Sequence, residues 1–310
     1  MNNIKVSIIC NTFNHESYIR DALDSFISQE TDFEYEILVH DDASTDKTPD
    51  IVREYEEKYP NIVKPIYQVE NQWSKDISIT MTYQYPRVRG TYIALCEGDD
   101  YWTDPRKLQK QVDALEANLD VDMCAHASSI VDGKTKKRIR TIKRSRKNTI
   151  IPIEEVIIGG GSFVATNSLM YRTSITRNLP EYVKFLHIDY VLQVYGSMRG
   201  GMLYLKDNMS DYRYMVPGSW SSKFKRNHEF TKVYDKKFDD MRELVNKETD
   251  GKYYRYFMFE KMIGSSDCKE ILTKEYRDIF KMLPIIKRCK TVIRAYFPSI
   301  INIKRSLRRP

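Results

Sequence analysis

Apolar and polar positions alternate along the first 120 residues in a way that predicts strands and helices in turn. Two short runs rich in β-branched residues, 5–11 and 35–40, have the length of buried strands. Between them, residues 16–29 carry apolar side chains at the spacing of one helical face. The same half continues with a helix over 47–59, strands over 63–68 and 91–96, and a helix that opens at Pro105. This order is typical of an open, mainly parallel α/β sheet.

After residue 122 the regular alternation of predicted strands and helices ends. Residues 134–147 alternate like a strand but contain little apolar surface, so we expect an exposed hairpin or a mobile loop there. Strands are predicted over 163–171 and 200–205, with a helix over 187–195 between them. From residue 223 onward the pattern is helical and rich in Lys, Glu, Tyr and Phe. We therefore predict a helical C-terminal extension.

Composition narrows the class of protein. The 310 residues include five widely scattered cysteines without paired or metal-binding spacing, which favours a reduced, cytoplasmic protein. No apolar run reaches the roughly 18 residues of a spanning helix. The N-terminus has no charged segment followed by a long apolar stretch, so we expect no secretory signal.

The net charge of +7 is concentrated in two segments. Residues 134–147 hold nine basic residues and residues 287–310 hold eight, with no acidic residue in either. Such asymmetry predicts a polyanionic partner, either an anionic membrane or nucleic acid. In residues 285–310 cations alternate with apolar residues, a composition that suits an interfacial segment on an anionic leaflet. A solvated helix packed on its own domain is the alternative.

Acidic residues follow two of the predicted strands. Asp41 and Asp42 end the strand over 35–40, and Glu97, Asp99 and Asp100 end the strand over 91–96. In open α/β sheets ligands bind beyond the carboxyl ends of strands. Closely spaced carboxylates there supply oxygen ligands for Mg²⁺ or Mn²⁺, which can neutralise a diphosphate. The alternative is that each cluster is a solvated turn that caps the following helix.

Two common phosphate-binding signatures are absent. The sequence has neither a P-loop nor a GxGxxG fingerprint, and residues 11–15 after the first strand read NTFNH. If a nucleotide binds this sheet, side chains and a metal must therefore hold its phosphates. Nucleotide-sugar transferases use this arrangement, whereas dehydrogenases and ATPases do not.

Four segments together resemble a known family. They read VSIICNTFNHESYIRDALDSFISQ, YEILVHDDASTDKT, VENQW and GTYIALCEGDDYWTDPRKLQKQ, and they are similar to the inverting family-2 glycosyltransferases of the GT-A fold over residues 4–118. A weaker continuation covers residues 187–222. The resemblance implies an α/β fold of GT-A type, with an open, mainly parallel sheet flanked by helices. It also implies a domain over 1–222, made of a Rossmann-like nucleotide-sugar-binding half (1–120) and an acceptor half (121–222), followed by the extension 223–310.

The resemblance also implies roles for individual residues. Asp189 matches the catalytic base, with Asp207 and Asp211 as alternatives. Residues matched to nucleotide binding are Asn11, Thr12, Asp41, Asp42, Asn71 and Glu97, and those matched to the metal, Mn²⁺ or Mg²⁺, are Asp99 and Asp100. Trp102 and Trp220 are weaker candidates for acceptor contact, with core packing an equal alternative for each. Many relatives carry a His where this chain has Met215, so Arg213 or Lys223 could supply its charge.

The function implied is a metal-dependent inverting hexosyl- or N-acetylhexosaminyl-transferase. It would move a sugar from a UDP-sugar to a saccharide acceptor, expected to be lipid-linked, in bacterial surface or capsule polysaccharide synthesis at the inner face of the cell membrane. One alternative is a nucleotidyltransferase of related fold, which would be expected to have a Gly-rich basic loop after the first strand. The other is a basic nucleic-acid-binding module, against which the acidic strand-end clusters argue.

Overall fold

The computed structural model describes residues 4–177, 179–180, 182–186, 189–263, 265 and 268–296. The chain forms two compact units. The first unit comprises residues 1–153 and 161–238, and the second comprises 154–160 and 239–310. The predicted division after residue 222 thus falls within the first unit.

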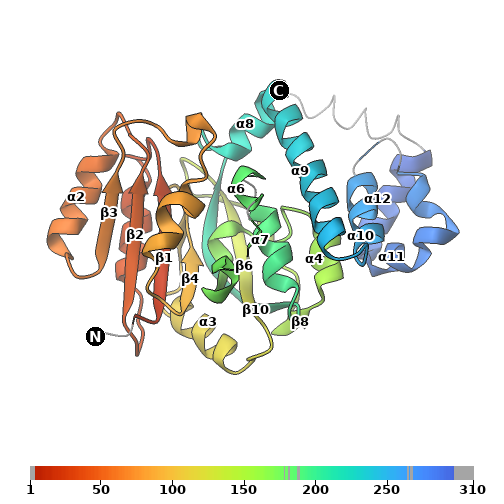
Figure 1. The fold of residues 1–310 in the computed structure, drawn as a ribbon, viewed down its shortest axis with the longest axis horizontal. Helices are drawn as coiled ribbons and strands as arrows, with labels where there is room; N and C mark the ends of the chain where they lie inside the picture. Colours follow the sequence, from red (N-terminus) through yellow and green to blue (C-terminus); the bar gives the residue numbers. More distant parts are fainter. Residues whose placement is uncertain are drawn as a thin grey trace. The chain divides into compact units, whose positions relative to one another are not determined.

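The N-terminal part of the first unit has the predicted strand–helix alternation (Figure 1). Its four parallel strands lie in the order β3 (Val63–Tyr67), β2 (Tyr35–Asp41), β1 (Val6–Thr12) and β4 (Tyr92–Leu95). The intervening helices are α1 (Ile19–Ile27) and α2 (Thr48–Lys58). The parallel strands bring their carboxyl ends to one edge of the sheet.

The rest of the sheet is mixed. Strand β9 (Met170–Arg172) runs antiparallel between β4 and β6 (Met123–Asp132), and β10 (Met202–Tyr214) is parallel to β6. Three short antiparallel strands complete the sheet in the described residues: β5 (Tyr101–Trp102) and β8 (Thr149–Ile151) on β10, and β7 (Arg138–Ile142) on β6. The α/β class and the exposed hairpin are confirmed. The antiparallel strands are the feature that the sequence pattern did not predict.

Helices fill most of the remaining chain. In the order of the sequence they are α3 (Lys107–Glu116), α4 (Ile153–Gly159), α5 (Ser174–Arg177), α6 (Val183–Leu186), α7 (Asp189–Ser197), α8 (Trp220–Arg226), α9 (His228–Glu248), α10 (Tyr254–Ile263), α11 (Arg277–Met282) and α12 (Ile285–Tyr296). Short turns of helix occur at η1 (Trp73–Lys75), η2 (Thr80–Gln84), η3 (Tyr85–Arg87), η4 (Thr166–Ser168), η5 (Glu270–Leu272) and η6 (Lys274–Tyr276). The strand predicted over 163–171 is wrong, because η4 interrupts it and only β9 pairs in the sheet.

The core of the first unit follows from strand periodicity. Alternate side chains of β1, such as Val6 and Ile8, are fully buried on one face of the sheet. Helix α1 covers them with Leu23 and Phe26, and α3 adds Leu108 to the same cluster. Each such side chain contributes roughly 1.5–3 kcal/mol when buried. The core thus fixes the strand ends from which the polar residues project.

The second unit has its own core. Phe259 of α10, Ile271 of η5 and Ile279 of α11 are fully buried there, and Ala295 of α12 packs on the same cluster. The helical extension is therefore confirmed over its described part, while residues 297–310 of the predicted interfacial tail lie outside the described residues. Among the described helices, none has the length and apolar character needed to cross a membrane.

Candidate active site

The loop after β4 lies directly against the end of β1. The amide of Gly98 donates a hydrogen bond to the carbonyl of Asn11 (2.9 Å). A Cβ atom at residue 98 would come within 2.7 Å of Thr12 Oγ1. Only glycine permits this approach, so the acidic residues on either side of Gly98 are held beside β1.

Asn11 connects this loop to a neighbouring segment. Its Nδ2 donates to Thr80 Oγ1 (3.1 Å) and lies 3.5 Å from Glu97 Oε1. Its Oδ1 accepts from Nε2 of Gln84, a fully buried residue that the sequence pattern did not single out. Thr12 is buried, and its Oγ1 has no hydrogen-bond partner among the described residues.

Asp41 and Asp42 shape the loops at the end of β2. The two oxygens of Asp42 accept hydrogen bonds from the amides of Gln72 (2.7 Å) and Trp73 (3.0 Å). Asn71 donates its Nδ2 to the carbonyl of Asp42 (3.0 Å). Asp41 accepts from the amide of Ser44, and burial raises the pKa of its carboxyl group. These predicted nucleotide residues are therefore brought together, with both carboxylates buried.

Three carboxylates gather beyond β4. Glu97 and Asp99 are half-buried, and Asp189 begins α7 and accepts a hydrogen bond from Thr166 Oγ1 (2.8 Å). Burial, followed by the negative charges of Asp189 and Asp99, raises the pKa of Glu97 to about 8. Asp189 is accessible to solvent, but the surrounding protein reduces its solvation and raises the pKa of its carboxyl group. The predicted base thus lies within electrostatic reach of the predicted metal motif.

Asp100 has a different environment from Asp99. It is 2% exposed, and its oxygens accept from the amide of Arg213 (2.8 Å) and from Nδ2 of Asn167 (3.1 Å). The Arg213 guanidinium, itself buried, donates to the carbonyl of Asp99 (2.7 Å) and pairs with Asp21. Both groups therefore anchor the loop, and Arg213 is not free to meet a diphosphate. Asn167 lies in the segment predicted as a strand, and no motif in the sequence marked it as a residue of the site.

A pair of tyrosines borders the carboxylates. The hydroxyls of Tyr85, in η3, and Tyr171, in β9, are 3.0 Å apart. Burial and the charge of Asp189 raise the pKa of both, so each hydroxyl stays protonated. Sequence reasoning missed this pair because neither residue belongs to a recognisable motif.

The two candidate acceptor tryptophans occupy unlike positions. Trp102 is 4% exposed, donates to the carbonyl of Asn167 (3.0 Å), and has the Lys107 Nζ 3.9 Å from its ring centre. Its burial in the core does not fit a stacking contact with an acceptor. Trp220 is 40% exposed and stacks on Phe224, with ring centres 4.6 Å apart. Of the two, Trp220 is the one that solvent reaches.

The alternative bases and cations also differ in availability. Asp207 lies 3.7 Å from the Lys110 Nζ, and Asp211 accepts from the Tyr101 hydroxyl (2.7 Å). The Lys223 Nζ lies 4.2 Å from the ring centre of Trp73 and makes no ion pair within the described part of the chain. Partial burial lowers its pKa. Lys223 is therefore a more accessible cation than Arg213.

The carboxylates of the site suit a metal ion whose remaining ligands come from a substrate. No three Asp, Glu, His or Cys side chains in the described ranges converge into a complete metal site. Mg²⁺ is commonly held by one or two carboxylates together with substrate phosphates. Glu97 and Asp99 supply two carboxylates. Burial, and then the negative charges of Asp189 and Asp99, raise the pKa of Glu97, and a bound cation would favour its ionised form. The residues present fit such an ion.

Comparison with known proteins identifies the family. The family model described as glycosyl transferase family 2 matches residues 7–179. The chain belongs to glycosyl transferase family 2. The family match covers β1 to β9, and with them Asn11, the carboxylates after β4 and Asn167. The acidic loop of this glycosyl transferase family 2 chain therefore lies inside the matched residues, whereas Asp189 and α8 follow them.

Individual relatives align with this chain over part of its length. An uncharacterized protein of Mycobacterium tuberculosis (strain H37Rv) is 34% identical over 230 residues, which cover 73% of this chain and 63% of the relative. A protein of Bacillus subtilis (strain 168) named as a candidate teichuronic acid biosynthesis glycosyltransferase, TuaG, is 29% identical over 160 residues, or 49% of this chain and 61% of the relative. This family 2 chain thus spans less than two thirds of the length of these relatives.

A solved structure shares the fold. The crystal structure of Staphylococcus aureus TarS residues 1–349 in complex with UDP-GlcNAc superposes with a TM-score of 0.62. The match covers 94% of this chain and 81% of TarS at 15% sequence identity. The family 2 chain therefore has the GT-A-type α/β fold predicted from its sequence.

Proposed function

We propose that this family 2 protein is a metal-dependent inverting glycosyltransferase that moves a hexosyl or N-acetylhexosaminyl group from a UDP-sugar to a saccharide acceptor. The observation that carries the proposal is the gathering of Glu97, Asp99 and Asp189 beyond the end of β4. The name of TuaG and the UDP-GlcNAc bound by TarS support a role in bacterial polysaccharide synthesis with a UDP-linked donor.

Glu97 and Asp99 are the residues that would hold the Mn²⁺ or Mg²⁺ ion. A divalent cation supplies positive charge that offsets the charge on a departing diphosphate. Asp100 keeps the loop in place through Arg213 and Asn167, and we leave it out of the metal-binding set. The nucleotide would lie over the ends of β1 and β2, where Asn11, Thr12, Asp41, Asp42 and Asn71 meet.

Asp189 is the proposed general base. Its carboxylate takes the proton from the acceptor hydroxyl while the hydroxyl oxygen attacks the anomeric carbon of the donor sugar. Attack comes from the face opposite the nucleotide, so the bond from the anomeric carbon to the phosphate oxygen breaks, and UDP leaves with the electron pair. The configuration of the sugar is thereby inverted. Thr166 orients Asp189 through its hydrogen bond of 2.8 Å.

Trp220 is the proposed acceptor contact. It stands at the start of α8, is 40% exposed, and stacks on Phe224. Aromatic faces stack on the apolar side of sugar rings, and they gain more from burial than a polar side chain would. Replacement by leucine is expected to weaken acceptor use more than donor use.

A membrane-bound, lipid-linked acceptor accounts for the surface of α12. Thr291 and Ala295 face the core of the second unit, whereas Ile285, Ile286 and Tyr296 are 60–71% exposed. Exposed apolar side chains interleaved with cations favour binding at the surface of an anionic bilayer. We therefore propose that the protein acts peripherally at the inner face of the cell membrane, with residues 285–310 in contact with the lipid.

Donor binding tests the first part of the proposal. Calorimetric titration with UDP, GDP, CDP and TDP in Mn²⁺ should give the strongest binding with UDP. The Asp99→Asn variant should lose this binding, whereas Asp120→Asn, a fully exposed control, should keep it. UDP affinity that is unchanged by both EDTA and Asp99→Asn would contradict the proposed metal dependence.

Turnover tests the assignment of the base. Removal of a general base typically lowers the rate by about 10²–10⁴-fold, so Asp189→Asn should release UDP from the preferred UDP-sugar that much more slowly. UDP affinity should change little. Asp207→Asn and Asp211→Asn are the matched controls. If either control loses turnover while Asp189→Asn turns over at a near-normal rate, the general base is that residue and not Asp189. The anomeric configuration of the product, read by NMR, decides between inversion and retention.

A further inference from the structure

The basic residues of 134–147 form an ordered hairpin, which we call the cationic hairpin. Its strand β7 pairs antiparallel with β6, from Val131 opposite Arg138 to Ser128 opposite Ile142. The hairpin begins after Asp132, at the carboxyl end of β6. Since β6 is parallel to β10 and points the same way as β4, this turn lies at the sheet edge that carries the active site.

Most of the charges on the hairpin make no ion pair with any residue that the structure describes. Lys136 pairs with Asp21 (2.8 Å), and Arg144 donates to the carbonyls of Ser162 and Phe163. The remaining basic residues are exposed and make no ion pair in the part of the chain that the structure describes: Lys134, Lys137, Arg138, Arg140, Lys143, Arg146 and Lys147. A fold gains nothing from this density of like charge, since the cations repel one another. The charges therefore indicate an external anion.

The hairpin turn adjoins the acidic loop. Lys134 and Lys136 line a cavity of about 280 Å³ together with Tyr18 and Arg213. Arg213 in turn donates to the carbonyl of Asp99 (2.7 Å), so the wall of this cavity is bonded to the metal-motif loop. The cations thus begin at the active-site edge and continue away from it along β7, over about 16 Å for five residues in a strand.

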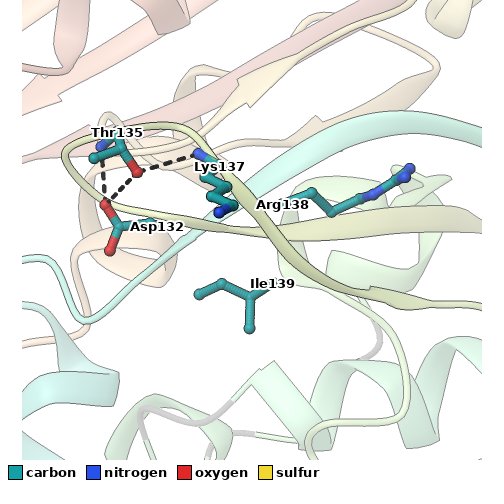
Figure 2. A pocket seen from close by; sticks show the side chains of 5 residues that line it. All are labelled: Asp132, Thr135, Lys137, Arg138 and Ile139. Carbon is teal, nitrogen blue, oxygen red and sulfur yellow. Dashed lines mark hydrogen bonds between the residues drawn. The ribbon is translucent and has the colours of Figure 1, made fainter.

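A second hollow lies on the hairpin itself. Its volume is about 410 Å³. The residues that line it are Asp132, Thr135, Lys137, Arg138 and Ile139 (Figure 2). The Asp132 carboxylate accepts hydrogen bonds from the amide and the hydroxyl of Thr135 (both 2.8 Å), and these bonds fix the turn. The hairpin therefore presents its charges from a defined backbone.

We propose that the cationic hairpin binds an extended anionic glycan, the acceptor, and guides its end to the active site. The inference rests on the proposed function and names the acceptor class as a saccharide carrying carboxylate or phosphate groups. The exposed cations of the hairpin would attract such an acceptor, and their row, which leads to the active-site edge, would steer it electrostatically.

The observations favour a glycan over a membrane or a nucleic acid. Ile139 is the one large apolar side chain between 134 and 147 that is exposed, whereas a membrane-binding segment needs several, as on α12. The hairpin sequence contains no aromatic residue on which a nucleobase could stack. A linear row of charge is complementary to an extended polyanion.

The test compares two variants of equal charge change in the full chain. Lys137→Gln, Arg138→Gln and Arg140→Gln are combined in the hairpin variant. The control combines Lys47→Gln, Lys58→Gln and Lys236→Gln, which are also exposed. Binding of fluorescent polygalacturonate at 150 mM NaCl, with neutral dextran as the reference, is expected to weaken about tenfold in the hairpin variant, the effect of three exposed ion pairs. The control should stay within about twofold of the wild type.

Each outcome decides the inference. Wild-type protein that does not prefer polygalacturonate to dextran would overturn it, as would a hairpin variant that binds like the control. A greater loss of affinity for vesicles of 30% phosphatidylglycerol, or for oligothymidylate, than for polygalacturonate would assign the hairpin to a membrane or to nucleic acid and also overturn it. UDP titration of the same samples separates the two proposals. Absence of UDP binding in the wild type contradicts the proposed function, whereas retained UDP binding in the hairpin variant shows that its donor site is intact.

Discussion

Lys107, at the start of α3, is fully buried, and its Nζ has no hydrogen-bond partner in the described part of the chain. Its ammonium lies 3.9 Å from the ring centre of Trp102, and burial lowers its pKa to about 7, an effect that Cys96 and Cys124 oppose in part. We predict that Lys107→Met, which keeps the length and removes the charge, changes how the stability of the protein depends on pH.

The magnitude follows from proton linkage. An unfolded lysine titrates near pH 10.4, so between pH 7 and pH 10 the unfolded chain binds one more proton than the folded protein. The free energy of unfolding therefore rises with pH in this window by about 1.4 kcal/mol per unit. Below pH 7 both states hold the proton and the contribution is constant. From pH 7, where the folded lysine is half protonated, to pH 9 the wild type should gain about 2.3 kcal/mol relative to Lys107→Met.

Urea unfolding at pH 6, 7, 8 and 9, followed by circular dichroism, measures this difference. The other titrating groups, including the buried cysteines, are common to both proteins and largely cancel. Lys110→Met, on the same helix but ion-paired to Asp104 at the surface, should run parallel to the wild type. A Lys107→Met profile parallel to the wild type would refute the reasoning, because it would mean that the Trp102 ring keeps Lys107 protonated in the folded state.

Two further predictions concern stability and location. Arg213→Met removes a buried cation from Asp21 and should lower the free energy of unfolding by about 3 kcal/mol. The control Arg20→Gln breaks an exposed pair with Glu54 and should lower it by less than about 1 kcal/mol. Urea denaturation measures both differences. Deletion of residues 285–310 should release the protein from phosphatidylglycerol vesicles in a sedimentation assay, and unchanged co-sedimentation would refute the membrane role of this segment.

The N-terminal half of the fold could be predicted because its local signals and its tertiary structure agree. The run 5–11 and the run 35–40 are apolar because the strands are covered on both faces, and β1 and β2 occupy nearly the same residues. Because the carboxyl ends of parallel strands lie at one edge of the sheet, the acidic residues that follow these strands lie at that edge too. For the same reason the meeting of Asn11 and Glu97 could be foreseen from sequence.

The remaining features depend on contacts between distant residues. The apolar stretch around Asn167 has the composition of a strand, but η4 forms there because Asn167 is held by Asp100, Ser210 and the carbonyl of Asp211. The sequence around Trp102 does not indicate whether its ring faces a ligand or lies in the core. Its burial depends on Phe26, whose ring centre lies 4.7 Å from that of Trp102, and this pairing exists only in the folded chain.

The bonds from Arg213 to the loop after β4 have a consequence for synthesis of the protein. A nascent chain exposes Asp99 and Asp100 long before the ribosome has made β10, which supplies the amide and guanidinium that hold them, 113 and 114 residues later in the sequence. Until β10 joins the sheet, the acidic loop lacks its anchors. Residues 1–120 include every predicted nucleotide-binding side chain but not Arg213, so we predict that this segment alone does not form the proposed donor site.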